Sequence, residues 1–366
     1  MSNTAWSIYN FRKPLIESLI RAGYSVYAVA PPDEYSERIV QQWNIPFVPV
    51  RRLQAKESNP FRDIQLMFEF RRIQRKYRFD AALCYTAKAN IYFNLGTVFK
   101  QVVYINTVNG LGSGMAGGDW VSLMMHRLYR LAFRRSDAIV FQNPDDRKYF
   151  LKHELVPEYK THVVNGSGID LSLFPPKTRF EENCLCLRFL WTSRLVKEKG
   201  IIEFIEAAAR IKKNYPNCQF IVCGLPANNP SAISPQLIET AAKKETITYI
   251  PGTDDMNTLL DECDVLVFPS YYREGVPRIL LEGLSKGLPL ITTTSVGCRE
   301  TILNEVNGYT VDIRNGYALA EVMEKMILLP PAKRREMEKQ SRKLAEEKFD
   351  VHKVNAKYLE LLQKLT

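Results

Sequence analysis

Two glutamates in the stretch REGVPRILLE have seven residues between them: Glu274 stands beside a glycine and Glu282 lies inside an apolar run. We predict a loop at Glu274, at the carboxyl end of a buried strand, and a helix that carries Glu282. The first turn of a helix leaves backbone amides without partners, and Gly275 allows close approach, so this helix start predicts an anion site. The two carboxylates then suit different parts of one extended, anionic, hydroxyl-rich ligand. Taken alone, Glu282 would equally be a solvated helix residue.

Two cations stand in the stretch LWTSRLVKEKGI. Arg194 and Lys199 follow the first strand that we expect in the second half of the chain. A guanidinium fork and an ammonium group at such a position suit a diphosphate. An ordinary charged loop is the alternative. The acidic loop and the helix start at another strand end favour a binding site.

Short apolar runs that alternate with amphipathic helical stretches must position these residues. Such alternation predicts βαβ units and parallel sheets, and hence an α/β fold. The alternating segments fall into two series, and the polar, proline-bearing stretch FPPKTRFEEN (174–183) separates them. We therefore expect two doubly wound, Rossmann-like domains that face each other across a cleft, with ligands beyond the carboxyl ends of the strands. The expected strands are 24–30, 45–50, 80–85, 102–108, 137–143, 187–193, 218–224, 246–252, 264–270 and 288–294.

The domain boundaries follow from the same pattern. Residues 1–170 form the first domain, 171–185 the linker, 186–345 the second domain and 346–366 a C-terminal helix. That helix carries an apolar stripe that must be covered, at Val351, Val354, Tyr358, Leu361 and Leu365.

The net charge of +10 lies almost wholly in the first domain, where residues 1–160 hold 23 Lys+Arg against 14 Asp+Glu. The excess is concentrated in 71–78 and 126–135. Solvated helix faces are one interpretation, and an anionic membrane surface or a phosphate-bearing substrate is another. Nucleic acid is less favoured, because no binding motif accompanies the charge. No apolar run is long enough to span a bilayer.

The seven cysteines include no C-x-x-C pair. Cys84, Cys186 and Cys223 lie in apolar, strand-like runs, which predicts reduced core thiols and a reducing compartment.

Three stretches resemble the C-terminal domain of retaining glycosyltransferases of family 4, which have the GT-B fold. They are SRLVKEKGI, PSYYREGVPRILLEGLSKGLPLITT and VGCRETI. Glu274 and Glu282 match the family's E-x7-E element. IYNFRKPLIESLIRAGYSVYAVAPPDEY and NGSGIDLSLF look like the subgroup that builds bacterial surface glycans on undecaprenyl diphosphate, such as N-acetylgalactosaminyltransferases and hexosyltransferases.

The resemblance implies roles for these residues. Arg194 and Lys199 would hold the diphosphate of a UDP-sugar and stabilise the charge of the leaving group, and Glu274 would contact the hydroxyls of the transferred sugar. Glu282 would contact the ribose. The other donor-binding residues implied are Gly275, Val276, Pro277, Arg278, Gly252 and Gly224. The chain has no D-x-D sequence, so we expect no metal requirement and no cofactor.

The first domain would bind the acceptor. Its glycine-rich loop TVNGLGSGMAGG (107–118) follows a strand, and glycines there permit close approach of a ligand, although a lid or a tight turn explains them equally well. Many relatives carry a histidine near this loop, where Asn109 and Gly110 stand here, so the sequence does not support a histidine-assisted mechanism. The acceptor-binding candidates are Asn10, Arg12, Lys88, Asn109, Gly110, Gly112 and Ser113.

The function that the sequence favours is transfer of a hexose or N-acetylhexosamine from a UDP-sugar to a polyprenyl-diphosphate-linked saccharide, with retention by front-face attack. We expect a cytoplasmic enzyme, peripheral at the inner face of the plasma membrane. A UDP-sugar epimerase of the same fold and an inactive sugar-nucleotide-binding relative are the alternatives.

The first strand of the first domain is the one expected element that is missing. We predict a helix from about Phe11, and the residues before it, SNTAWSIYN, read as a polar loop. A first strand normally lies inside such a sheet, and its loss leaves buried backbone groups unpaired at about 1–3 kcal/mol each. The expectation is that the natural chain starts upstream of Met1, with about 5–10 further, mostly apolar residues, and that the chain as given folds poorly or lacks activity.

Overall fold

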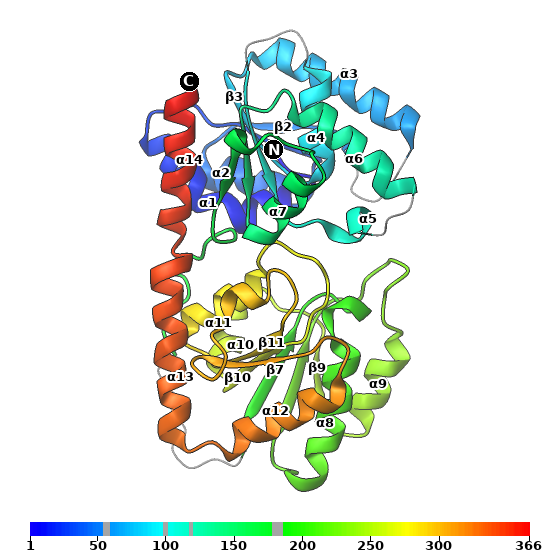
Figure 1. The fold of residues 1–366 in the computed structure, drawn as a ribbon, viewed down its shortest axis with the longest axis vertical. Coiled ribbons are helices and arrows are strands. Elements are labelled where there is room, and N and C mark those ends of the chain that lie inside the picture. Colours follow the sequence, from blue (N-terminus) through cyan, green and yellow to red (C-terminus); the bar gives the residue numbers. More distant parts are fainter. Residues whose placement is uncertain (54–58, 98–101, 117–119, 178–185) are drawn as a thin grey trace. The chain divides into compact units, whose positions relative to one another are not determined.

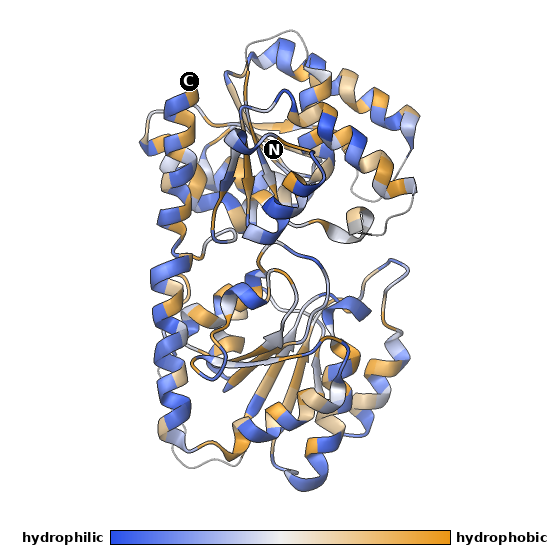
Figure 2. Cartoon of the chain, in the orientation of Figure 1, coloured by the Kyte–Doolittle hydropathy of each residue, from blue (hydrophilic) through white to orange (hydrophobic). Residues whose placement is uncertain are grey.

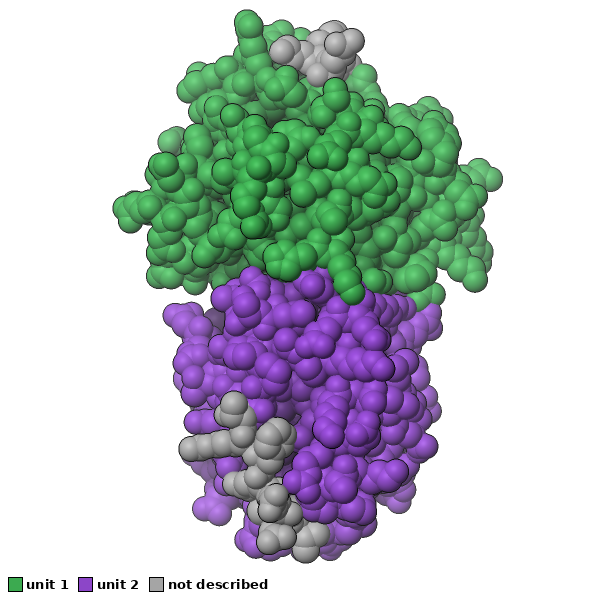
Figure 3. Space-filling model, turned by 90° about the vertical axis from the view of Figure 1, so that its left-hand side faces the viewer, with its two compact units in different colours: residues 1–167, 351–366 green, residues 168–350 purple. Residues whose placement is uncertain are grey.

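The computed structural model describes residues 1–53, 59–97, 102–116, 120–177 and 186–366. These residues form two compact units (Figure 3). Unit 1 comprises residues 1–167 and 351–366, and unit 2 comprises residues 168–350. The linker expected at 171–185 lies partly outside the described residues, and its described part belongs to unit 2.

Unit 1 contains two parallel sheets. A four-stranded sheet has the order β3-β4-β5-β6, and a separate two-stranded sheet pairs β1 with β2. The strands are β1 (Ala28–Ala30), β2 (Phe47–Pro49), β3 (Ala81–Tyr85), β4 (Val103–Val108), β5 (Ala138–Phe141) and β6 (Thr161–Val163). The helices are α1 (Ala5–Arg21), α2 (Tyr35–Trp43), α3 (Pro60–Tyr77), α4 (Ala87–Gly96), α5 (Gly112–Ala116), α6 (Trp120–Phe133), α7 (Pro144–Lys152) and α14 (Val351–Leu365) (Figure 1).

Unit 2 is built around one parallel sheet of order β12-β11-β10-β7-β8-β9. Its strands are β7 (Arg188–Thr192), β8 (Gln219–Cys223), β9 (Thr248–Ile250), β10 (Val265–Phe268), β11 (Leu290–Thr293) and β12 (Gly308–Val311). Its helices are α8 (Ile201–Asn214), α9 (Pro235–Lys243), α10 (Met256–Asp261), α11 (Arg278–Lys286), α12 (Gly316–Leu328) and α13 (Pro331–Leu344).

The ten strands expected from the sequence are all present, and no end differs from the expected one by more than four residues. Two further strands were not expected. β6 has only three residues, THV, and β12 begins with a glycine, so neither shows the apolar run that marks the others.

The first helix begins at Ala5 rather than at Phe11, so the prediction of a polar loop before Phe11 was wrong. The side chain of Thr4 accepts a hydrogen bond from the backbone amide of Ser7 at 3.1 Å, which caps the helix. Ala5 and Ile8 are buried. This cap and two inward-facing apolar residues extend the helix through a stretch whose polar composition resembles a loop.

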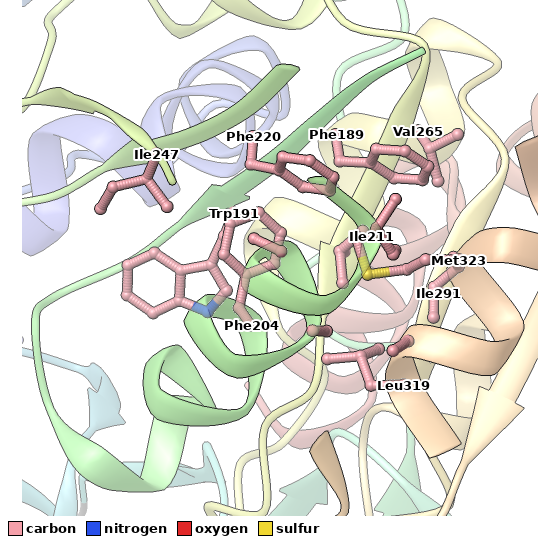
Figure 4. Close-up of a cluster of buried hydrophobic side chains, with 14 of the residues drawn as sticks. Phe189, Trp191, Phe204, Ile211, Phe220, Ile247, Val265, Ile291, Leu319 and Met323 are labelled. Atoms are coloured by element: carbon pink, nitrogen blue, oxygen red, sulfur yellow. The ribbon is translucent and has the colours of Figure 1, made fainter. Parts of the chain in front are cut away.

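The core of unit 2 is aromatic and lies between the sheet and its helices. Figure 4 shows Phe189 and Trp191 of β7 close to Phe204 of α8 and Phe220 of β8. The rings of Phe189 and Phe220 stack with their centroids 5.4 Å apart. Figure 2 shows the same pattern along the chain, with hydrophobic strands and helices that are hydrophilic on one side. The centre of this sheet is therefore a rigid base for the loops at its carboxyl edge.

The C-terminal helix α14 packs in unit 1. The hydroxyl groups of Tyr358 and Thr107 are 2.8 Å apart, and Asn355 donates a hydrogen bond to the Ser18 hydroxyl of α1 at 3.3 Å. Of the apolar stripe expected on this helix, Val351, Val354, Tyr358 and Leu361 are buried and Leu365 is half-buried.

Candidate active site

The loops after β7 and β10 meet at the topological switch point of unit 2. The chain passes from β7 to β8 and β9 on one side, and then crosses to β10 on the other side of β7. In open parallel sheets the connections diverge at such a point, which leaves a ligand-sized space beyond the carboxyl ends of the two strands. Arg194 and Lys199 follow β7, and Glu274 follows β10.

Contacts of the backbone at Lys199 and Gly200 fix the position of the lysine. It ends the short 3₁₀ turn Lys197–Lys199, and its carbonyl oxygen accepts a hydrogen bond from the Trp191 indole at 3.0 Å. Gly200 follows with φ at +75°, and a Cβ there would lie 2.2 Å from the carbonyl oxygen of Pro269. Only glycine combines this left-handed backbone with so close a contact. The turn after β7 is thereby pressed against the loop after β10.

The ammonium group of Lys199 donates a hydrogen bond to the carboxylate of Glu274. The two side chains are 7% and 21% exposed. The lysine nitrogen also lies 5.3 Å from the ring centroids of both Phe268 and Tyr272, where the face of an aromatic ring attracts a cation. The structure thus brings together two of the three residues predicted to be catalytic.

Glu198 fixes the loop after β10 through its backbone. Its carbonyl oxygen accepts hydrogen bonds from the amides of Tyr271 at 2.9 Å and Tyr272 at 3.2 Å, and from the Ser270 hydroxyl at 3.2 Å. The sequence did not indicate this role of Glu198, because any residue type can accept a hydrogen bond through its backbone carbonyl.

Gly297 supports the same loop from the side of β11. Its φ is +85°, and a Cβ would lie 2.2 Å from the carbonyl oxygen of Gly275 and 2.9 Å from that of Glu274. No side chain fits there, so this glycine sets the position of the carboxylate-bearing loop. In the sequence, the glycine in the stretch VGCRE was the feature that could have indicated this backbone contact.

Arg194 is exposed. Among the residues that the structure describes, its side chain has no hydrogen bond or ion pair. Its guanidinium donors are therefore available to a ligand, at the same strand end as the paired Lys199.

Glu282 lies one helical turn after Arg278 on α11, and the arginine Nε donates to its carboxylate at 3.0 Å. Arg278 also donates to the carbonyl oxygen of Gly168 at 2.8 Å. Burial raises the pKa of Glu282, and the charge of Arg278 opposes that rise. No direct hydrogen bond or ion pair joins Glu282 to Lys199 or Glu274 within the described part of the chain.

The backbone at the start of α11 is set by Pro277. Pro277 is the residue just before the helix, which runs from Arg278 to Lys286 and is followed by Gly287 with φ at +76°. Pro277 has an extended backbone, so it directs the chain into the helix instead of occupying its first turn. The neighbouring Gly275 and Val276 are buried.

Gly224 and Gly252 also stand at strand ends. A Cβ on Gly224 would lie 2.0 Å from the carbonyl oxygen of Ser193, so close packing of β7 and β8 already requires a glycine there. Gly252 has φ at +82° in the turn after β9. Contact of either residue with a donor stays a prediction.

Three of the predicted acceptor residues in unit 1 make contacts within the protein. Lys88 on α4 forms an ion pair of 3.0 Å with Asp63 of α3. Arg12 on α1 is buried, with its guanidinium carbon 3.8 Å from the centroid of the Tyr85 ring. Asn10 is exposed and donates to the carbonyl of Trp6 at 3.0 Å. Their roles toward an acceptor stay predictions.

The glycine-rich loop follows β4 as expected. Gly110 and Gly112 have positive φ values of +118° and +63°, and α5 begins at Gly112 and includes Ser113. The side-chain oxygen of Asn109 is buried without a hydrogen-bond partner among the described residues. The end of this stretch, 117–119, lies outside the described residues.

Two family models match the chain, one in each unit. Residues 13–166 match a glycosyl transferase 4-like domain, and residues 187–344 match the glycosyl transferases group 1 domain. The chain belongs to family 4 of the glycosyltransferases. It is thus a transferase, and its two doubly wound domains are those of the GT-B fold.

Curated relatives are similar over most of the chain. An N,N'-diacetylbacillosaminyl-diphospho-undecaprenol alpha-1,3-N-acetylgalactosaminyltransferase of Campylobacter jejuni is 26% identical over 336 residues, which are 88% of this chain and 86% of that protein. A UDP-Gal:alpha-D-GlcNAc-diphosphoundecaprenol alpha-1,3-galactosyltransferase of Escherichia coli is 22% identical over 325 residues, 82% of each chain.

Solved structures agree in fold. A glycosyltransferase of Rickettsia africae has a TM-score of 0.77 at 17% identity, and the match covers 98% of this chain and 95% of that one. Anabaena Alr3699/HepE in complex with UDP has a TM-score of 0.75 at 16% identity, covering 99% and 98%. Within the described residues of this glycosyltransferase, no helix has the length and apolarity needed to cross a membrane.

Proposed function

We propose that this glycosyltransferase moves a hexose or N-acetylhexosamine from a UDP-sugar to a polyprenyl-diphosphate-linked saccharide and retains the configuration at the sugar's C1. The observation that carries the proposal is the buried pair of Lys199 and Glu274, with Arg194 exposed at the same strand end. This arrangement offers positive charge to a diphosphate and a carboxylate to sugar hydroxyls. The names of the Campylobacter and Escherichia relatives support the lipid-linked acceptor.

In this proposal the diphosphate of the donor binds Arg194 and shares Lys199 with Glu274. The carboxylate then accepts hydrogen bonds from hydroxyls of the transferred sugar. Glu282, whose carboxylate is oriented by Arg278, accepts from the ribose hydroxyls. Positive charge placed beforehand near the leaving group stabilises the charge that develops on it, and such electrostatic stabilisation commonly contributes most to catalysis.

The transfer step follows front-face attack. The bond between C1 and the diphosphate oxygen breaks, and its electron pair leaves with UDP. The acceptor hydroxyl oxygen forms the new bond to C1 from the same face, and its proton passes to the departing phosphate oxygen. The fixed charges of Arg194 and Lys199 take the place of a divalent metal, so we propose that the reaction needs none.

A lipid-linked acceptor requires that the enzyme work at a membrane surface, and two helices of unit 1 suit that task. The exposed face of α3 has Phe61, Ile64 and Phe68 in its first half, followed by Arg72 and Arg75. On α6 the same order recurs, with Trp120, Leu123 and Met124 followed by Arg127, and Arg134 comes directly after the end of the helix. Both helices pack against α4. Aromatic residues beside arginines favour an anionic lipid interface, so we propose a peripheral membrane enzyme.

The test is to incubate the full chain with a panel of UDP-sugars, with and without a synthetic polyprenyl-diphosphate-linked sugar. We expect a lengthened lipid product and release of UDP only when both substrates are present. The anomeric coupling of the product, measured by NMR, should match that of the donor.

Each other outcome contradicts a defined part of the proposal. An inverted product excludes retention. Conversion of the UDP-sugar to its epimer without the lipid shows an epimerase, and binding without turnover shows an inactive relative. Activity that EDTA abolishes and a divalent metal restores contradicts the metal-free mechanism.

A further inference from the structure

Ser270 lies in the loop after β10, four residues before Glu274, and is fully buried. In the sheet of unit 2, β10 has β7 on one side and β11 on the other. Ser270 makes hydrogen bonds to the loops that follow both of these neighbours. It therefore joins three strand ends at the carboxyl edge where the candidate active site lies.

The hydroxyl group of Ser270 connects it to the turn after β7. It donates a hydrogen bond to the carbonyl oxygen of Glu198 at 3.2 Å, and it accepts one from the amide of Tyr272 at 3.3 Å. Glu198 is the residue before Lys199 in that turn. The hydroxyl thus lies between the backbone that carries Lys199 and the backbone that leads to Glu274.

The carbonyl oxygen of Ser270 bonds to the loop after β11. It accepts hydrogen bonds from the hydroxyl of Ser295 at 2.8 Å and from the hydroxyl of Thr293, and these two hydroxyl oxygens are 2.7 Å apart. The thiol of Cys298, a weak donor, lies 3.9 Å from the same carbonyl oxygen. Several donors around one carbonyl oxygen leave it little freedom to turn.

The peptide unit between Ser270 and Tyr271 is therefore held at both ends. Its carbonyl accepts from the loop after β11, and its amide, which belongs to Tyr271, donates to the carbonyl of Glu198 at 2.9 Å. A peptide unit is planar, so bonds at its two ends fix its orientation and the direction in which the chain continues. Glu274 follows three residues after Tyr271.

The ion pair of Lys199 and Glu274 does not by itself fix the position of the two charges. A lysine ammonium group stands on a flexible four-carbon stem, so it can follow a carboxylate over a range of positions. A transition state needs its charged groups placed in advance, and a misplacement of about 1 Å costs up to about 10²-fold in rate. The backbone bonds of Ser270 supply this placement, because they set the separation of the two loops.

Replacement of Ser270 by Ala separates this effect from a general loss of stability. The carbonyl of Glu198 would keep the amides of Tyr271 and Tyr272 as donors, and the Tyr272 amide would keep that carbonyl as its acceptor. Loss of a hydrogen bond is costly mainly when it leaves a buried polar group unpaired, and neither group is left so. The substitution therefore removes one link to the turn of Lys199 and leaves the carbonyl side of Ser270 intact.

We propose that Ser270 is a positioning residue of the sugar transfer, which acts through Lys199. Its hydroxyl holds the turn of Lys199, and its carbonyl holds the loop of Glu274 against the loop after β11. The ammonium group and the carboxylate are thereby kept at the spacing that the diphosphate and the sugar of the donor require. This inference rests on the proposed function, because it assigns a role within the proposed site. Ser270 itself is buried and contacts no substrate.

The experiment compares Ser270→Ala with Ser341→Ala in the full chain. Ser341 is also fully buried, and its hydroxyl donates to the carbonyl of Leu288 at 2.8 Å, next to the amino end of β11. We expect Ser270→Ala to lower kcat by about tenfold or more, while the KM for the UDP-sugar and the Kd for UDP rise by only about threefold. Both variants should lower Tm to a similar, small extent, and Ser341→Ala should leave kcat and the Kd for UDP unchanged.

A second arm combines Ser270→Ala with Lys199→Ala. Because Ser270 acts through Lys199, its replacement should have no further effect on kcat or on the Kd for UDP once the lysine is absent. A merely structural role would instead change both quantities by the same factor with and without Lys199.

Two results would overturn the inference. One is a Ser270→Ala variant whose kinetics match those of Ser341→Ala, and the other is a Ser270→Ala effect of equal size in both lysine backgrounds. The UDP measurement needs no turnover, so it separates these failures from a failure of the proposed function. A parent chain that binds UDP but transfers no sugar contradicts the proposed function alone, provided that the Kd effect of Ser270→Ala still depends on Lys199. A parent chain that binds no UDP overturns both.

Discussion

Lys199 and Glu274 stand 75 residues apart in the chain, yet their side chains form a hydrogen-bonded ion pair that is mostly buried. The lysine follows β7 and the glutamate follows β10, which are neighbours only because the sheet order reverses there. Each residue neutralises the other while no ligand is bound. In the proposed mechanism the pair supplies both positive charge for the diphosphate and a carboxylate for the sugar hydroxyls.

Replacing Lys199 with Ala should lower kcat by about 10²–10³, the scale for loss of one fixed charge donor. Stability should also fall by about 1–3 kcal/mol, because Glu274 loses its partner in a largely buried place. Steady-state kinetics and thermal unfolding measure the two effects. Lys197→Ala removes an exposed cation from the same turn and should change neither. Equal kinetics for both variants would refute the role given to Lys199.

Glu274→Gln and Glu282→Gln should give different kinetic signatures. The first removes a contact to the reacting sugar and should act mainly on kcat. The second removes a contact to a part of the donor that does not react, and should act mainly on KM and on the Kd for UDP. Glu239→Gln, on the exposed face of α9, is the matched control. A shared pattern for the two site variants would rule out separate roles.

Gly297→Ala should disturb the loop that carries Glu274. The added Cβ would meet the Gly275 carbonyl at 2.2 Å, and the backbone has φ at +85°. We expect destabilisation of about 2–5 kcal/mol and weaker UDP binding. Gly114→Ala is the stability control, because a Cβ there meets nothing within 4 Å. Normal stability and UDP affinity in Gly297→Ala would show that this loop is not held by the close contact.

The proposed membrane contact of α3 and α6 can be tested by vesicle sedimentation. Replacing Phe68 and Trp120 with Ser should weaken binding to anionic vesicles by about tenfold or more, since both side chains are exposed and apolar. Arg72→Glu with Arg127→Glu should weaken it further, and added salt should release the parent chain. Tyr159→Ser changes another exposed aromatic residue and should have no effect. Unchanged binding in the α3 and α6 variants would place the lipid contact elsewhere.

The amino group of Met1 should make stability depend on pH. Burial lowers its pKa from 8.0 to about 6, the nearby Cys84 opposes this shift, and Arg12 lowers the pKa further. Between these two values the unfolded chain holds a proton that the folded chain has released, so the free energy of unfolding rises with pH from about 6 to 8. Two pKa units correspond to about 2–3 kcal/mol.

Acetylation of Met1 provides the control for that titration. The acetylated chain lacks the titrating α-amino group of Met1 but keeps every other titratable group, His126 and His162 included. The difference between the two stability curves should therefore rise across pH 6–8 and be flat above it. A constant difference would show that the amino group is not buried in the folded state.

The strand pattern, the family and the local motifs were readable from the sequence, because each depends on neighbouring residues. Apolar runs such as DVLVFPS mark strands at any position in the fold. Arg194, Lys199, Glu274 and Glu282 stand in motifs whose spacing is fixed along the chain. The start of α1 was misjudged because a capping threonine and two buried residues outweighed the local polarity.

Only the tertiary structure decided which of these residues meet. Sheet order places the ends of β7 and β10 side by side, and no local pattern encodes that order. The carbonyl of Glu198 and the missing side chain of Gly297 act through backbone contacts between distant segments, so residue type gives little sign of them. For the same reason Arg12, which the sequence predicts to be an acceptor-binding cation, is buried with its guanidinium group over the ring of Tyr85. A side chain's type sets the interactions it can make, and the packing of distant segments determines which of them it makes.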